Sequence, residues 1–143
     1  MTADRTITLD PQVRQQVQQA LVQAYPYEGC GLIGGRQDAG GWQVHVCAMA
    51  TNASERAARQ FEIDPLWYTR TERQWNGQGT QVLGVVHSHP DCPPIPSETD
   101  RVYATNWPGF LWWIVRVDDR HVRDQRVWVL TPEARFTEVA LSV

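Results

Sequence analysis

The stretch Val86-His87-Ser88-His89-Pro90 ends a strongly apolar run that begins at Val82. A continuous apolar run of this kind predicts a strand buried on both faces, and we expect it over Gln81–His87. Residues two apart on a strand project to the same face, so His87 and His89 direct two imidazoles toward one point. Functional sites are commonly built where a buried strand ends. The expected fold and site are both organised around this stretch.

The segment after the second histidine predicts a third ligand. Pro90 to Pro96 carries four prolines and is expected to be an irregular loop. Ser97 is a suitable N-cap for a short helix over Glu98–Thr105, with Asp100 in its first turn. If the loop folds back toward the strand end, Asp100 approaches the two imidazoles. Imidazole nitrogen and carboxylate oxygen suit zinc, and three protein ligands leave one position for water, as in catalytic sites.

Glu28 is the candidate general base. It lies in Tyr27-Glu28-Gly29-Cys30-Gly31, between an expected helix and an expected strand, where glycines let the backbone approach a neighbouring element. A nucleophilic water needs a base to accept its proton. Each motif alone has an ordinary structural explanation: a structural histidine pair, a helix cap or a surface carboxylate. Only their combination indicates an active site.

The rest of the sequence predicts an α/β domain with a central mixed sheet flanked by helices, and residues 1–143 are expected to form one domain. Helices are expected from the N-cap Asp10 to about Tyr25 and from Pro65 to about Trp75. Asn52–Arg59 is expected to be a loop. The other expected strands are Thr6–Leu9, Gly31–Gly35, Trp42–Ala48, Leu111–Val117, Val122–Leu130 and Phe136–Leu141, with Phe61–Ile63 as a further candidate.

Composition excludes several classes of function. The formal net charge is -3, and the 13 basic residues are scattered rather than clustered, so no nucleic-acid partner is expected. No apolar stretch approaches the length of a membrane span, and residues 1–10 lack the apolar core of a signal peptide. Three cysteines do not make a disulfide framework, although one disulfide stays open. These features favour a reduced, cytoplasmic protein.

The arrangement of Glu28, His87-x-His89-Pro90 and Ser97-x-x-Asp100 resembles the complete JAMM motif of the MPN+ zinc metalloproteases. The resemblance implies that His87, His89 and Asp100 bind zinc. It implies that Glu28 deprotonates the zinc-bound water and returns the proton to the leaving amine. It also implies that Ser97 donates a hydrogen bond to the oxyanion.

The spacing and the flanking residues strengthen this resemblance. The ten-residue spacer between His89 and Asp100 matches the family, and so does Cys-Gly-Leu at residues 30–32, closely following Glu28. The implied fold is a cytidine-deaminase-like α/β domain. Because the chain is too short for the two ubiquitin-binding insertions of larger relatives, it resembles the compact prokaryotic subgroup, including the Mec-type hydrolases that process sulfur-carrier proteins.

The resemblance implies a cytoplasmic zinc peptidase that cuts a peptide or isopeptide bond after the C-terminal Gly-Gly of a ubiquitin-like or sulfur-carrier protein. Two alternatives stay open: a non-catalytic MPN module that binds such a tail, and a peptidase of cell-wall peptides. The presence of Glu28 and Ser97 favours an enzyme over a binding module, because a structural zinc site needs neither residue. A deaminase is rejected because its Cys-x-x-Cys ligand pair is absent.

Four further features have two interpretations each. Phe61–Ile63 is either an ordinary edge strand or a strand that pairs with an extended substrate tail. Cys92 is either a spectator or a redox-sensitive thiol that caps the metal. Asn52 fits a structural turn better than a chemical role. Trp112 and Trp113 are neighbours on one strand and point to opposite faces, so one of them faces outward unless a helix or a partner covers it. An outward tryptophan would favour a homodimer or a protein-binding face.

Overall fold

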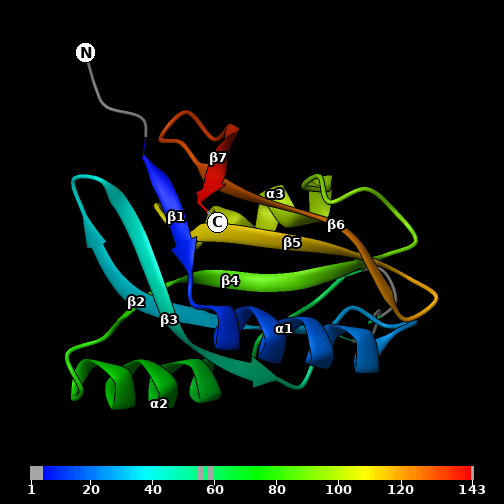
Figure 1. Ribbon diagram of the computed structural model, residues 1–143, viewed down its shortest axis with the longest axis horizontal. Helices are drawn as coiled ribbons and strands as arrows, with labels where there is room; N and C mark the ends of the chain where they lie inside the picture. Colours follow the sequence, from blue (N-terminus) through cyan, green and yellow to red (C-terminus); the bar gives the residue numbers. More distant parts are fainter. Residues whose placement is uncertain (1–4, 55–56, 58–59, 143) are drawn as a thin grey trace.

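The computed structural model describes residues 5–54, 57 and 60–142, and within them seven strands and three helices form one continuous arrangement (Figure 1). The helices are α1 (Pro11–Ala24), α2 (Pro65–Asn76) and α3 (Glu98–Ala104). The strands are β1 (Thr6–Leu9), β2 (Cys30–Asp38), β3 (Gly41–Ala50), β4 (Gln81–Pro90), β5 (Leu111–Asp118), β6 (His121–Leu130) and β7 (Phe136–Ser142). Part of the predicted loop Asn52–Arg59 lies outside the described residues.

The strands form a mixed sheet that closes on itself in the order β1-β3-β2-β4-β5-β6-β7. The prediction of a mixed sheet is confirmed, since β4 pairs with β5 in parallel while β5, β6 and β7 pair in antiparallel fashion. Closure was not predicted. It occurs because the short strand β1 pairs in parallel with both β3 and β7, which removes the two free edges that an open sheet would expose.

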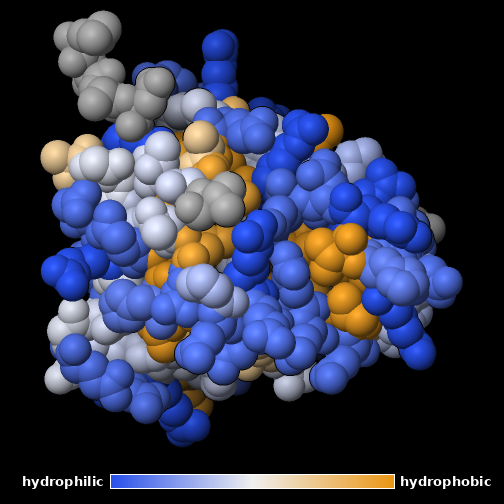
Figure 2. All heavy atoms as spheres, in the orientation of Figure 1, coloured by the Kyte–Doolittle hydropathy of each residue, from blue (hydrophilic) through white to orange (hydrophobic). Residues whose placement is uncertain are grey.

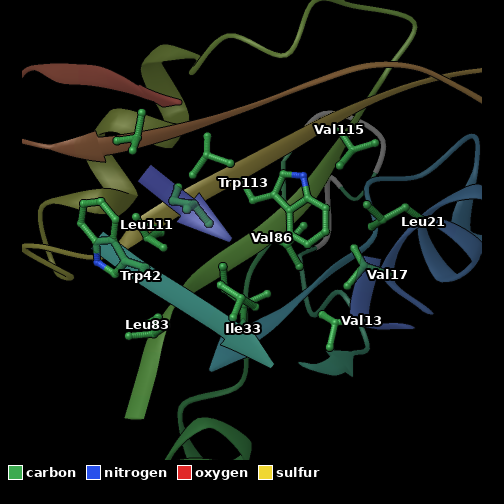
Figure 3. Packing of buried hydrophobic residues seen from close by; sticks show 14 of the residues in the cluster. Val13, Val17, Leu21, Ile33, Trp42, Leu83, Val86, Leu111, Trp113 and Val115 are labelled. Carbon is green, nitrogen blue, oxygen red and sulfur yellow. The ribbon is translucent and has the colours of Figure 1, made fainter. Parts of the chain in front are cut away.

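Helix α1 covers one face of the sheet. Asp10 caps it by accepting a hydrogen bond from the Gln12 amide at 2.8 Å, and Pro11 occupies the first turn, as the sequence predicted. Figure 3 shows its buried side chains near Trp113 and Val86 of the sheet. These side chains are Val13, Val17 and Leu21, at helical spacing.

The opposite face is covered by α2, α3 and the segment before α2. Trp112 of β5 packs there with Phe61, Trp75 and Ala104. Because Trp112 and Trp113 project to opposite faces and each is covered within one chain, both are fully buried. This pair therefore gives no support to a homodimer, which stays a prediction. The face drawn in Figure 2 is largely hydrophilic, with apolar residues reaching the surface in separate areas.

Strand β4 is longer than predicted and this extension fixes the site. Its parallel pairing with β5 continues through His87↔Ile114 and His89↔Arg116 to Pro90↔Val117. Both histidines therefore lie on regular strand, which holds their side chains on one face. Phe61–Ile63, in contrast, is not a strand: in the described residues it is an irregular segment with Phe61 and Ile63 buried and Glu62 exposed. None of the described helices is long and apolar enough to cross a membrane.

Gly84 allows β4 and β5 to approach, and replacing it by alanine is expected to destabilise the fold. A Cβ at this position would lie 2.1 Å from the backbone oxygen of Leu111, a contact that only strand separation can relieve. We expect a loss of about 3 kcal/mol in the free energy of unfolding, measured by urea denaturation.

Gly77→Ala is the matched control for this change. Gly77 has right-handed helical backbone angles, and the nearest atoms to an added Cβ are 3.5 Å away. Alanine should therefore be neutral or stabilise by about 0.4–1 kcal/mol. Equal stability of the two variants would contradict the close approach at Gly84.

Candidate metal centre

His87 and His89 converge at the end of β4 as predicted. Their Nε2 atoms lie 3.2 Å apart, and both side chains are buried. Ser88 projects to the other face, where its Oγ accepts a hydrogen bond from the Gly29 amide at 2.9 Å while its own amide donates to the Gly29 carbonyl at 3.0 Å. Ser88 thus fastens the chain next to Glu28 to the histidine strand, a role that the sequence analysis did not assign.

Asp100 joins the two histidines because α3 begins at the expected residue. Ser97 Oγ accepts from the Asp100 amide at 3.0 Å, and the Asp100 carboxylate accepts from the Ser97 amide at 2.9 Å, which forms a capping box. This cap directs Asp100 Oδ1 to 3.2 Å from His87 Nε2 and Oδ2 to 3.0 Å from His89 Nε2. The Pro93 carbonyl, 2.9 Å from His89 Nδ1, orients the second imidazole from behind.

The geometry of this cluster fits a zinc ion. In a tetrahedral shell with bonds of about 2.0–2.1 Å, the ligand atoms lie about 3.4 Å from one another. The two Nε2 atoms lie 3.2 Å apart, and each lies close to one oxygen of Asp100: His87 Nε2 is 3.2 Å from Oδ1, and His89 Nε2 is 3.0 Å from Oδ2. These separations are near that spacing. Two imidazole nitrogens and a carboxylate oxygen are also the donor set that zinc accepts. His87, His89 and Asp100 could therefore hold the ion together.

Glu28 lies beside this cluster. A carboxylate oxygen of Glu28 and a ring nitrogen of each of His87 and His89 all lie within 4.8 Å of one another. The side chain is 5% exposed, and Oε1 has no hydrogen-bond partner among the described residues. Burial, assisted by the charge of Asp100, raises the pKa of Glu28 to about 8, although His89 opposes the shift.

The three candidate ligands have coupled charges. Burial lowers the pKa of His87, outweighing the attraction of Asp100, and keeps that imidazole in the neutral form that binds metals. Burial alone would lower the pKa of His89, but the hydrogen bond and charge of Asp100 raise it overall. Burial alone would raise the pKa of Asp100, but the two histidines hold it well below its usual range. Asp100 is therefore ionised and available to a cation.

The segment between β3 and α2 contributes two residues whose importance the sequence analysis missed. Phe61, predicted as part of a strand, instead stacks its ring on the His87 imidazole, with centroids 4.3 Å apart. Asn52 accepts and donates hydrogen bonds within this segment and to the backbone of Glu28. An asparagine between a strand and a polar segment is a common turn signal, so only the contacts distinguish it from an ordinary turn residue.

The three cysteines are free thiols, as expected. Cys30 is buried, and this burial, with the nearby charge of Glu28, raises the pKa of its thiol to about 12. Cys92 is an exposed residue whose thiol is partly shielded from water. This shielding is the main cause that raises the pKa of the thiol, and the charge of Glu28 adds to it, so the thiolate form is disfavoured. The structure therefore gives no support to a metal-capping thiolate at Cys92.

A groove of about 530 Å³ lies between α3 and the segment that leads into α2. One wall is the segment before α2 and the other is the exposed side of α3. The lining residues are Glu62, Ile63, Pro65, Glu98, Thr99, Val102, Tyr103 and Asn106. Ser97, at the N-terminus of α3, uses its Oγ as the acceptor of the helix cap, so its hydroxyl hydrogen stays available for a further acceptor.

Comparison with known proteins relates the chain to one family. A family model described as prokaryotic homologs of the JAB domain matches residues 10–130. A desampylase of Haloferax volcanii is 33% identical over 95 residues, which are 66% of each chain, and a desampylase of Pyrococcus furiosus is 31% identical over 84 residues, 59% of this chain and 56% of the relative. The chain thus matches just under two thirds of the first relative and little more than half of the second.

A solved structure shares the fold. A protein of Desulfitobacterium hafniense superposes with a TM-score of 0.84 at 25% sequence identity, covering 96% of this chain and 92% of the other. The closed mixed sheet with its three helices is therefore an arrangement found across nearly the whole length of both proteins.

Proposed function

Because this chain belongs to the family of prokaryotic homologs of the JAB domain, as a compact JAMM/MPN member, we propose that it is a zinc-dependent peptidase that releases groups attached to the C-terminal tail of a ubiquitin-like or sulfur-carrier protein. The observation that carries the proposal is the convergence of His87, His89 and Asp100 at 3.0–3.2 Å with the buried Glu28 beside them. The names of the two desampylase relatives support the substrate class.

The proposed chemistry divides between the ion and the protein. Bound zinc would polarise the scissile carbonyl and lower the pKa of water at the site to about 7. Glu28 accepts one proton from the attacking water and delivers it to the leaving amine. The carbonyl carbon gains a bond to oxygen and loses its bond to nitrogen, so the products are a carboxylic acid and an amine. Ser97 donates a hydrogen bond from its hydroxyl group to the oxyanion.

The groove beside α3 is the proposed binding site for the substrate tail. Its lining includes Glu98 and Thr99, which follow Ser97 directly in the chain, and its walls would enclose an extended peptide. Pairing through the edge of Phe61–Ile63 is limited, because the Glu62 amide donates to the Asn52 side chain at 3.1 Å and the Ile63 amide donates to the Tyr103 hydroxyl at 3.1 Å. Recognition therefore falls mainly to the groove side chains.

Two structural proposals accompany the functional one. The fold is proposed to be cytidine-deaminase-like in its finer detail, and residues 1–143 are proposed to form one domain. The match over residues 10–130 and the continuity of one sheet from β1 to β7 support both.

The zinc-loaded protein is expected to cut after Gly-Gly in preference to other tails. Glycine has no Cβ to collide with the walls of a narrow approach to the metal. Two carrier proteins, each extended by one residue beyond a Gly-Gly or an Ala-Ala end, should differ by about 10-fold or more in kcat/KM. Cleavage is measured by mass spectrometry of the released carrier.

Three outcomes contradict this proposal. Equal cleavage of both carriers would remove the Gly-Gly preference. Cleavage of neither, together with rapid hydrolysis of cell-wall peptides, would favour the alternative of a cell-wall peptidase. Tight binding of the Gly-Gly carrier without any cleavage would favour a non-catalytic binding module.

A further inference from the structure

We infer that Asn52 is a positioning residue of the metal centre, whose side-chain amide ties the backbone of Glu28 to the segment that packs Phe61 against His87. The inference rests on the proposed zinc site. It adds a residue that touches neither the proposed ligands nor the groove, and that acts through its neighbours.

The hydrogen bonds of Asn52 use both ends of its amide. Nδ2 donates to the carbonyl of Glu28 at 2.9 Å and to the carbonyl of Gln60 at 2.9 Å. Oδ1 accepts from the amide of Ser54 at 3.0 Å and from the amide of Glu62 at 3.1 Å. One half-buried side chain thus joins the backbone at Glu28 to backbone groups on both sides of Phe61. A residue that only ended a turn would not need the bond to Glu28.

The segment that contains Asn52 also binds the backbone amide of Glu28. The Glu28 amide donates to the Ala57 carbonyl at 2.6 Å, and the Ala57 carbonyl is also 3.5 Å from Asn52 Nδ2. Gly29 is fixed to Ser88 by the pair of bonds described above. The backbone of Glu28 therefore depends on β4 for one attachment and on Asn52 and its segment for the others.

The residues that Asn52 binds on either side of Phe61 place the Phe61 ring against His87. Gln60 and Glu62 flank Phe61, which is 2% exposed and stacks on the His87 ring at 4.3 Å with an interplanar angle of 26°. Trp112 meets the same imidazole edge-on at 5.7 Å and 83°. The ring is thus enclosed between two aromatic side chains.

His87 depends on this packing because its Nδ1 atom makes no hydrogen bond with the residues that the structure describes. Metal-ligating histidines usually donate their second ring nitrogen to a carboxylate, carbonyl or water, which fixes the ring orientation. His89 has such a partner in Pro93, whereas His87 Nδ1 is buried without a hydrogen-bond partner among the described residues. The orientation of His87 therefore rests on Phe61, and the position of Phe61 rests on the bonds of Asn52 to its two neighbours.

The test compares metal binding by Asn52→Ala with that by Gln125→Ala. Gln125 is the matched control: it is half-buried and bonds to Trp113 at 3.0 Å and Gln18 at 3.4 Å, away from this segment. Removing an outer partner of a metal site typically costs 10–100-fold in metal affinity. We expect Asn52→Ala to lose about 10–100-fold in zinc affinity and to change the visible spectrum of bound cobalt, while Gln125→Ala keeps both.

Two more variants keep the test decisive. Asn52→Asp retains the acceptor but loses the donors to Glu28 and Gln60, and Phe61→Leu retains apolar bulk but loses the flat ring. Both should weaken cobalt binding, and they decide the matter if Asn52→Ala does not fold. Parental metal affinity and spectrum in folded Asn52→Asp and Phe61→Leu would overturn the inference, and so would a parent chain that binds neither zinc nor cobalt.

Activity separates this inference from the proposed function. If the parent cleaves the Gly-Gly carrier, Asn52 variants loaded with metal should lose kcat with little change in KM. If the parent binds metal but cleaves no substrate, the proposed function fails while the metal affinities still decide the role of Asn52.

Discussion

Glu28→Gln is expected to remove nearly all peptide-bond cleavage while the protein keeps its fold and its zinc. Glutamine has the same size and shape but cannot accept the proton of the attacking water. A positioned general base typically contributes 10²–10⁴-fold, so we expect kcat to fall by about that factor. Because Glu28 Oε1 has no hydrogen-bond partner among the described residues, the amide should break no bond of that oxygen. Kinetics with the Gly-Gly carrier and metal analysis by mass spectrometry check both halves.

The control for this variant is Glu138→Gln, which removes an exposed carboxylate of β7 away from the metal centre. It should retain parental kcat and zinc. Loss of zinc in Glu28→Gln would contradict the assignment of Glu28 as the general base. Because the Glu28 carboxylate lies within 4.8 Å of the ring nitrogens of His87 and His89, such a loss would make Glu28 a ligand and would leave the base unassigned.

The arrangement of the candidate ligands could be predicted because local patterns encode it. An apolar run sets the strand, alternation places His87 and His89 on one face, and Ser97 begins a helix whose third residue is Asp100. Each step involves residues that are close in sequence. The structure brings the three side chains together as expected, although their role as zinc ligands stays a prediction.

Long-range contacts account for what could not be predicted. The closure of the sheet depends on β1 finding β7 at the other end of the chain, and the pattern of four residues does not specify two partners. The Phe61–Ile63 segment has the composition of a strand, but its backbone bonds to Asn52 and Tyr103 take the place of a ladder. β-propensity reflects packing partners more than backbone preference, and here those partners are distant in sequence.

Asp100→Ala is expected to abolish stoichiometric zinc binding, and activity with it. The carboxylate faces both imidazoles, at 3.2 Å from His87 Nε2 and 3.0 Å from His89 Nε2, so its removal takes away a ligand and leaves two buried nitrogens facing each other. The loss of zinc affinity should exceed the 10–100-fold typical of outer partners. Zinc is measured by mass spectrometry of the purified protein and by competition with a chelating dye. His87→Ala should give the same result.

Asp64→Ala separates loss of a metal ligand from loss of a helix cap. Asp64 caps α2 by accepting from the Leu66 amide at 3.1 Å, as Asp100 supports the first turn of α3 through Ser97. Asp64→Ala should cost about 0.5–2 kcal/mol of stability through the lost N-cap. Asp100→Ala should also weaken the start of its helix, because it removes the acceptor of the Ser97 amide, but only Asp100→Ala should lose zinc. If zinc content stayed complete in both Asp100→Ala and His87→Ala, the ion would have to be held elsewhere, and the His87, His89 and Asp100 cluster would be a buried polar network without a metal.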